Sequence, residues 1–162
     1  MKKLFLVCLG IATILTLSSA IEGKTCESKT LKKEGISELN PFYYSASKIT
    51  LIDYDYKASR KEIEVPLFKG EKYKMVFNKK GLPKDVLIEI FDKDKSHEHR
   101  HPLFTTKDDA ADIVSYIPEK SKKMYVRYTI PKSEGIKDSG CIVFILGYQL
   151  TFVADKKSEG NK

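Results

Sequence analysis

Residues 141–152, CIVFILGYQLTF, form the longest apolar stretch between residues 21 and 162. Its length would suit a buried helix, but β-branched and aromatic residues dominate it, and these favour strands. Gly147 in its interior also argues against a helix and is typical of a strand that carries a bulge. We therefore predict a long buried strand here, and a fold built on β-sheet.

Shorter strand patterns recur along the rest of the chain. In residues 61–67, Ile63, Val65 and Leu67 alternate with two glutamates and Pro66, which predicts one buried face at a sheet edge or strand end. Residues 86–91, VLIEIF, are almost continuously apolar and indicate a central strand. The same signals, bounded by turn residues, mark residues 49–56, 73–77, 103–104, 113–117 and 124–130.

About seven or eight short strands without a long helical period predict an all-β fold, an antiparallel β-sandwich of the jelly-roll kind. We place this domain at residues 49–153. A polar segment, residues 21–48, precedes it and is expected to be irregular or to form one or two helical turns that Gly35 ends. Residues 154–162 are expected to be a disordered, solvated tail.

The first twenty residues have the order of a secretory signal peptide. Two lysines are followed by an apolar run, residues 4–17, and then by the small residues Ser18, Ser19 and Ala20. The run is shorter than the roughly 18 apolar residues that a membrane span needs. We predict cleavage after Ala20, no membrane span in the mature chain, and a location in the periplasm or the extracellular medium.

The charge of the chain does not indicate a nucleic-acid partner. The sequence has 29 basic and 22 acidic residues and a net charge of +7, which falls to +5 when Lys2 and Lys3 are removed with the signal. The lysines are spread along the chain, whereas a nucleic-acid footprint would gather them with aromatic residues on one element. A mixed-charge, solvated surface is the expected result.

Two of the three cysteines remain after cleavage, because Cys8 lies in the signal. In an oxidising compartment, an even number of cysteines indicates disulfide pairing. We therefore predict a bridge between Cys26 and Cys141, with two unpaired thiols as the alternative.

All three histidines lie in one charged segment. His97, His99 and His101 would share one side of an extended chain, and imidazoles are good ligands for Zn²⁺ or Cu²⁺. Asp94 could serve as a fourth ligand. The competing interpretation is a solvated loop, which the alternating charges around the histidines favour.

Tyrosine is abundant and tryptophan is absent. Tyr54 and Tyr56 would share one face of a strand and could present a ring platform to a ligand such as a glycan, although tyrosine serves structure equally well. No serine lies in a Gly-x-Ser-x-Gly setting, and no carboxylate pair marks a glycosidase. We expect no enzyme activity and no cofactor.

Similarity to a known family is carried by residues 61–73, 77–78, 81–83, 123–126, 140–144 and 146–148. These segments resemble a family of uncharacterised small secreted proteins from Bacteroidetes bacteria. The resemblance covers most of residues 41–150 and implies secretion and a compact domain, without a particular chemistry. The order of strands is also loosely similar to bacterial pre-peptidase C-terminal domains, which are β-sandwich modules of secreted enzymes.

Taken together, these patterns predict a secreted, non-enzymatic β-sandwich protein that acts by binding or structural association at the cell envelope. The partner is unknown, and an envelope protein or a glycan is the candidate. Two alternatives stay open. One is a metal-binding envelope protein that uses the histidine segment, and the other is an unrecognised hydrolase.

Overall fold

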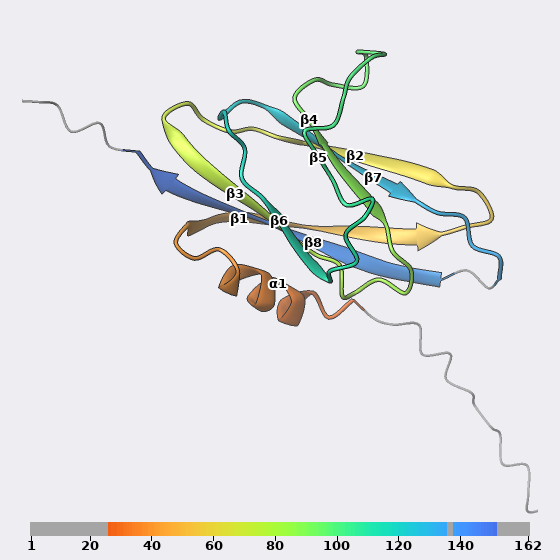
Figure 1. The fold of residues 1–162 in the computed structure, drawn as a ribbon. Helices are drawn as coiled ribbons and strands as arrows, with labels where there is room; N and C mark the ends of the chain where they lie inside the picture. Colours follow the sequence, from red (N-terminus) through yellow and green to blue (C-terminus); the bar gives the residue numbers. More distant parts are fainter. Residues whose placement is uncertain (1–25, 136–137, 152–162) are drawn as a thin grey trace, which may run out of the picture.

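The computed structural model describes residues 26–135 and 138–151 (Figure 1). The predicted signal peptide and tail lie outside these residues. One helix and eight strands follow in chain order. Their bounds are α1 Ser28–Ser37, β1 Tyr43–Tyr54, β2 Ser59–Val65, β3 Glu71–Asn78, β4 Leu87–Phe91, β5 Phe104–Thr105, β6 Ile113–Tyr116, β7 Met124–Ile130 and β8 Asp138–Leu150.

The strands form two four-stranded sheets in which every pair is antiparallel. The first sheet has the order β1-β8-β3-β6 and the second has the order β2-β7-β4-β5. Successive strands, except β4 and β5, lie in different layers, in the manner of an eight-stranded jelly roll. The predicted all-β sandwich is therefore confirmed.

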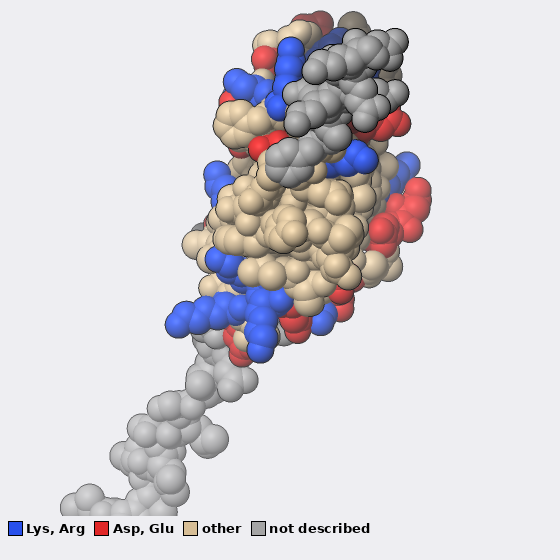
Figure 2. Space-filling view, turned by 90° about the vertical axis from the view of Figure 1, so that its left-hand side faces the viewer, with Lys and Arg blue, Asp and Glu red and all other residues tan. Residues whose placement is uncertain are grey.

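Four connections meet at one end of this sandwich, which we call the loop end. At this end β8 finishes beside the start of β1, with Tyr43 opposite Tyr148, and beside the start of β3, with Glu71 opposite Leu150. Figure 2 looks at this end and shows a broad uncharged area with lysine, arginine and acidic side chains around it. The connections are residues 38–42, 66–70, 92–103 and 117–123.

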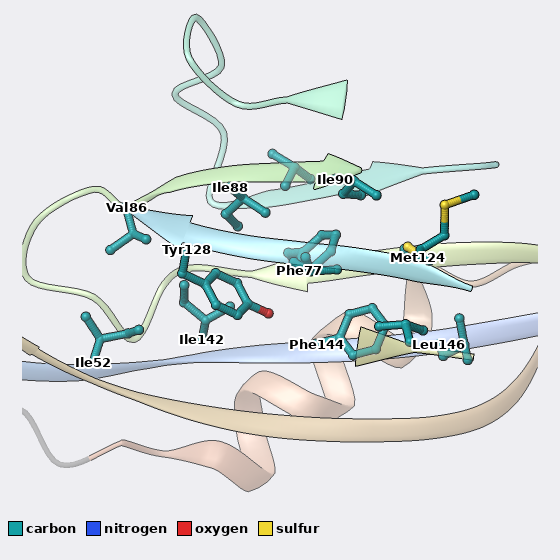
Figure 3. Packing of buried hydrophobic residues seen from close by; sticks show 14 of the residues in the cluster. Ile52, Phe77, Val86, Ile88, Ile90, Met124, Tyr128, Ile142, Phe144 and Leu146 are labelled. Atoms are coloured by element: carbon teal, nitrogen blue, oxygen red, sulfur yellow. The ribbon is translucent and has the colours of Figure 1, made fainter. Parts of the chain in front are cut away.

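The core lies between the two sheets (Figure 3). It is built from the inward-facing side chains of strands in which buried and more exposed residues alternate. In β7, for example, Met124, Val126 and Tyr128 are buried while the residues between them are partly exposed. Strand side chains alternate between two faces, so this pattern supplies one apolar face per strand. The central members, all fully buried, are Ile52, Met75, Phe77, Ile88, Ile90, Val126, Tyr128 and Ile142.

A second, smaller apolar cluster lies outside the first sheet, where α1 packs on β8 and β3. Leu31 of the helix and Leu39 just after it cover Val143 and Ile145 of β8. The predicted disulfide is present at the start of this contact, since Cys26 is bonded to Cys141 with their Cα atoms 5.6 Å apart. β8 is thus buried on both faces, which explains its nearly continuous apolar sequence.

The helix does not end at Gly35, as the sequence had suggested, but continues to Ser37. A Cβ atom at Gly35 would lie 2.3 Å from the Cδ1 atom of Ile145. The glycine therefore sits where the helix packs tightly against Ile145 of β8, and its missing side chain permits this approach.

The bulge expected at Gly147 lies on the neighbouring strand instead. The register between β1 and β8 shifts between Tyr44 and Ala46, opposite Gly147, whereas β8 pairs regularly with β3. Gly147 allows a different contact, because a Cβ atom there would lie 2.7 Å from the Cδ2 atom of Leu39.

Other strand predictions agree with the structure except at their limits. β2 is an edge strand that ends just before Pro66, and β4 lies inside the second sheet. β1 begins at Tyr43, six residues before the predicted domain boundary, and ends at Tyr54. Within the described residues, no helix is long and apolar enough to cross a membrane.

Candidate functional site

The loop end carries exposed apolar side chains from three segments of the chain. Phe68, in the connection between β2 and β3, is 70% exposed, and Tyr43 and Leu150 are also exposed. The rings of Tyr43 and Tyr148 lie 6.1 Å apart, and Tyr148 is the cross-strand neighbour of Tyr73. We call Tyr43, Phe68, Tyr148 and Leu150 the aromatic patch.

The position of Phe68 beside this row of tyrosines is set by hydrogen bonds. Its backbone N–H donates to the Tyr73 hydroxyl at 3.3 Å, and the Tyr73 hydroxyl in turn donates to Glu71. The hydroxyl of Thr151 donates to the carbonyl of Gly70. The turn is thereby fixed to the ends of β3 and β8, so that the aromatic patch stands on a rigid base.

A hollow of about 360 Å³ opens at the loop end on the side of β6 and β5. Met124 and Tyr116 line it from the core side, and the half-exposed side chains of Leu103 and Ile117 flank it. The ring of Tyr116 stacks at 5.3 Å on Phe104, and burial raises the pKa of its hydroxyl. These four side chains form one apolar wall of the hollow, which can contact a small apolar group.

The rim of the hollow is charged. Lys122 donates to Asp92 at 2.7 Å, and this contact lowers the pKa of the Asp92 carboxyl. Glu119 and Lys120 complete the rim. Acidic and basic groups balance here, so the rim favours neither an anion nor a cation.

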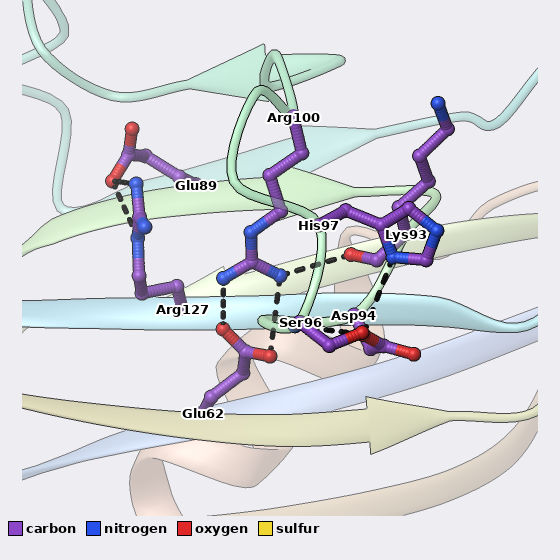
Figure 4. A network of polar contacts seen from close by, with 8 residues as sticks. All are labelled: Glu62, Glu89, Lys93, Asp94, Ser96, His97, Arg100 and Arg127. Carbon is purple, nitrogen blue, oxygen red and sulfur yellow. Dashed lines mark hydrogen bonds and ion pairs between the residues drawn. The ribbon is translucent and has the colours of Figure 1, made fainter.

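The connection between β4 and β5, residues 92–103, projects from the sandwich and is held at its base by Arg100 (Figure 4). The guanidinium of Arg100 pairs with both carboxylate oxygens of Glu62 on β2 and also donates to the carbonyl of Lys93 at 2.9 Å. Only 7% of the Arg100 side chain is exposed. Bidentate arginine–carboxylate contacts of this kind fix orientation as well as position.

Phe91 supports this contact from below. Arg100 lies 4.1 Å from the centre of the Phe91 ring, and Arg127 lies 4.5 Å from it. Arg127 is itself paired with Glu89 at 2.9 Å. The outer face of the second sheet therefore holds the projecting loop through the Arg100–Glu62 pair, and the guanidinium groups of Arg100 and Arg127 both stack on the Phe91 ring.

We predict that Glu62→Gln loosens the loop without unfolding the domain. Loss of the carboxylate leaves the charge of the nearly buried Arg100 guanidinium without its ion-pair partner. The population of molecules in which residues 92–103 are locally open should therefore rise about tenfold. Limited trypsin digestion at Lys93 and Lys95, with hydrogen exchange of the same loop, measures this. Glu64→Gln is the matched control, because Glu64 lies on the same strand and its pair with Lys123 is half exposed. Equal cleavage of the two variants would contradict the role of Arg100.

The structure does not bring the three histidines together. His97 lies 3.3 Å from Asp94, and Ser96 donates to the same carboxylate through its hydroxyl and its backbone N–H. These Ser96 hydrogen bonds, with a smaller effect of His97, lower the pKa of Asp94 to about 2. Across residues 26–135 and 138–151, no group of three or more histidine, cysteine or acidic side chains is arranged to hold a metal ion, and His99 and His101 are exposed.

The prediction that Tyr54 and Tyr56 form an exposed platform is wrong. Tyr54 is 1% exposed, because it follows Thr50 and Ile52 on the inward face of β1, and its hydroxyl donates to the carbonyl of Lys84. Burial raises its pKa to about 12. Tyr56 is exposed but lies beyond the last residue of β1, at the end of the sandwich opposite the loop end.

Sequence reasoning missed the aromatic patch and the Arg100 contact. Phe68 directly follows an alternating strand pattern and reads as its last apolar residue, whereas it lies in the connection between β2 and β3. Glu62 and Arg100 are 38 residues apart, and only the pairing of β2 with β7 and of β7 with β4 brings them together.

No protein-family model matches the chain, and no curated protein matches it. Among solved structures, one that resembles it is the crystal structure of Aeromonas hydrophila PliG, a periplasmic lysozyme inhibitor of g-type lysozyme. The two share 10% sequence identity at a TM-score of 0.43, over 66% of this chain and 88% of that chain. Because this likeness is loose, the function proposed below is drawn from the residues of this chain.

Proposed function

We propose that this chain is a secreted, non-enzymatic β-sandwich protein that binds another protein of the cell envelope through its loop end. The observation that carries the proposal is the disulfide between Cys26 and Cys141. Structural disulfides persist in oxidising compartments and are rare in the cytosol. The bridge thus supports the export that the first twenty residues predict.

The loop end supports the binding part of the proposal. Loops held on a rigid sandwich are the usual place for recognition residues. Exposed aromatic side chains are enriched in protein interfaces, and the residues that dominate binding often fill a pocket on the partner. The aromatic patch and the hollow beside Leu103 and Ile117 supply both elements at the same end. The apolar wall of the hollow can take an apolar side chain of a protein, and its charged rim can pair with polar groups around that side chain, so we favour a protein partner over a glycan.

The export part is tested by fractionating cells that produce the full chain. We expect the protein outside the cytosol, starting at residue 21, with Cys26 bonded to Cys141 in non-reducing mass spectrometry. Cytosolic protein with residues 1–20 intact and two free thiols would contradict it.

The binding part is tested with a photo-crosslinking amino acid placed singly at Phe68, Leu103 or Tyr56. Phe68 and Leu103 report on the loop end, and Tyr56 is the matched control because it is 69% exposed at the other end. We expect one envelope protein to be crosslinked from the first two positions and not from the third. Equal crosslinking from all three positions, or none, would contradict the site.

Substrate turnover that one loop substitution abolishes would contradict the non-enzymatic part.

A further inference from the structure

β1 is a long edge strand with one unpaired side. It spans 12 residues, pairs with β8 on one side only, and forms the edge of the first sheet. The other three edge strands offer less backbone or more charge: β5 has two residues, β6 has four, and β2 carries two basic and two acidic residues in SRKEIEV and ends at Pro66. Long edges with little charge are sites for pairing with another strand.

The free backbone groups of β1 can be assigned from one side-chain contact. The Leu51 carbonyl accepts a hydrogen bond from the Lys61 side chain at 2.6 Å, so it faces away from β8. Residues of an antiparallel strand alternate in the side to which they turn N–H and C=O. The register from Ala46 to Tyr54 is regular, so Ser47 and Ile49 also turn their backbone groups outward. We call Ser47–Leu51 the open edge.

The side chains of the open edge add an apolar strip to this backbone. Ile49 and Leu51 are 48% and 61% exposed. They lie on the outer face of the first sheet, opposite Val143 and Cys141, which belong to the cluster beneath α1. The strip thus continues the apolar surface that the helix covers on β8, and it is left open on β1.

We propose that two copies of this chain join their first sheets through antiparallel pairing of β1 with β1, with Ile49 on the twofold axis. In this register, Ile49 faces Ile49 of the second copy, and Ser47 faces Leu51. These are the residues that turn their backbone groups outward, so the hydrogen-bonding pattern is satisfied without a shift. The Leu51 carbonyl has a second lone pair and can keep Lys61 while it accepts from the new strand.

The self-complementary edge favours a second copy over an unrelated strand. Antiparallel pairing about a twofold axis repeats each contact, as isologous dimers require. It places both half-exposed isoleucines side by side on one face, with each Leu51 diagonal to the opposite Ile49. On the other face, Lys48 lies opposite Thr50, so no like charges are directly opposed. The open edge contains no residue of the aromatic patch or of the hollow, so failure of this pairing would leave the proposed binding function untouched.

Sedimentation of the mature chain from about 1 µM to about 1 mM, a range in which weak interfaces dissociate, tests the proposal. We expect a reversible rise from monomer to dimer. Ile49→Arg should abolish it, whereas Ile117→Arg should not, because Ile117 is 51% exposed and lies outside β1. Ser47→Pro should also abolish it while preserving the fold, since the N–H that it removes points to solvent. A monomer at every concentration, or equal loss in both arginine variants, would overturn the proposal.

A cysteine crosslink tests the register. Directly opposed, hydrogen-bonded residues of antiparallel strands have Cα atoms about 5.5 Å apart, so two cysteines there lie within reach of a short bismaleimide. Ile49→Cys should therefore form a covalent dimer with this reagent, and Ile117→Cys should not. Mass spectrometry that keeps the Cys26–Cys141 bridge intact identifies the new bond. No crosslink at residue 49, or equal crosslinking of the two variants, would overturn the pairing about Ile49.

Discussion

Replacing Cys26 and Cys141 together by alanine is expected to lower the free energy of unfolding by about 5 kcal/mol. The bridge joins residues 115 positions apart, so it closes nearly the whole described chain into one loop. In the chain-entropy account, opening a loop of this length increases the conformational entropy of the unfolded state, which lowers the free energy of unfolding by about 5 kcal/mol. Small domains are stable by only about 5–15 kcal/mol, so the effect takes a large part of the total.

Thermal unfolding followed by circular dichroism measures this loss. A decrease of about 15 °C in the melting temperature corresponds to the expected change for a domain of this size. Reductant should lower the melting temperature of the parent chain by a similar amount and leave the alanine variant unaffected, which controls for the substitutions themselves. If the variant and the oxidised parent have the same melting temperature, the bridge does not restrict the conformations of the unfolded chain.

The bridge also has a local role, because it lies between α1 and β8. Cys141 is fully buried in the cluster that Leu31 and Leu39 cover. Without the bond, the first turn of the helix is still held by its packing and by the hydrogen bond from the Asn78 side chain to the Leu31 carbonyl, at 3.0 Å. We therefore expect hydrogen exchange in α1 to rise before that of β3 or β7.

The sequence predicted the sheets better than the contacts between them. Alternation in residues 61–67 and 124–130 is a local consequence of one buried face, and both strands were found where expected. The helix was underestimated because Gly35 acts through Ile145, which is distant in the sequence. Tyr54 was assigned to the surface because a period of two gives two faces and does not say which one is inside.

The candidate site was predicted less well for the same reason. The histidine segment is conspicuous in the sequence, but the loop that carries it is fixed by Arg100 through Glu62, a contact between strands that no local pattern reveals. The aromatic patch joins a turn, the start of β1 and the end of β8. The proposed membership in a secreted Bacteroidetes family stays a prediction.

The second large effect is expected for Phe77→Ala in the centre of the core. Phe77 is fully buried on β3, its ring lies 5.2 Å from Phe144 of β8, and it meets Tyr128 of the opposite sheet edge-on at 6.5 Å. Removing the ring loses the stabilisation that comes from burying it and leaves a cavity between the sheets. Such replacements typically cost about 3–5 kcal/mol, and we expect about 4 kcal/mol here.

Phe68→Ala is the matched control, because the same side chain is removed from a position that is 70% exposed. Its effect on the free energy of unfolding should stay within about 0.5 kcal/mol. Urea unfolding measures both variants, and an unchanged slope would show that the difference lies in stability rather than in the extent of unfolding. The cavity at Phe77 should not collapse, because the Phe144 and Tyr128 backbones are held in sheets by neighbours on both sides. A loss below about 1 kcal/mol for Phe77→Ala would mean that the sheets close over the gap, and the rigid sandwich assumed for the loop end would then be wrong.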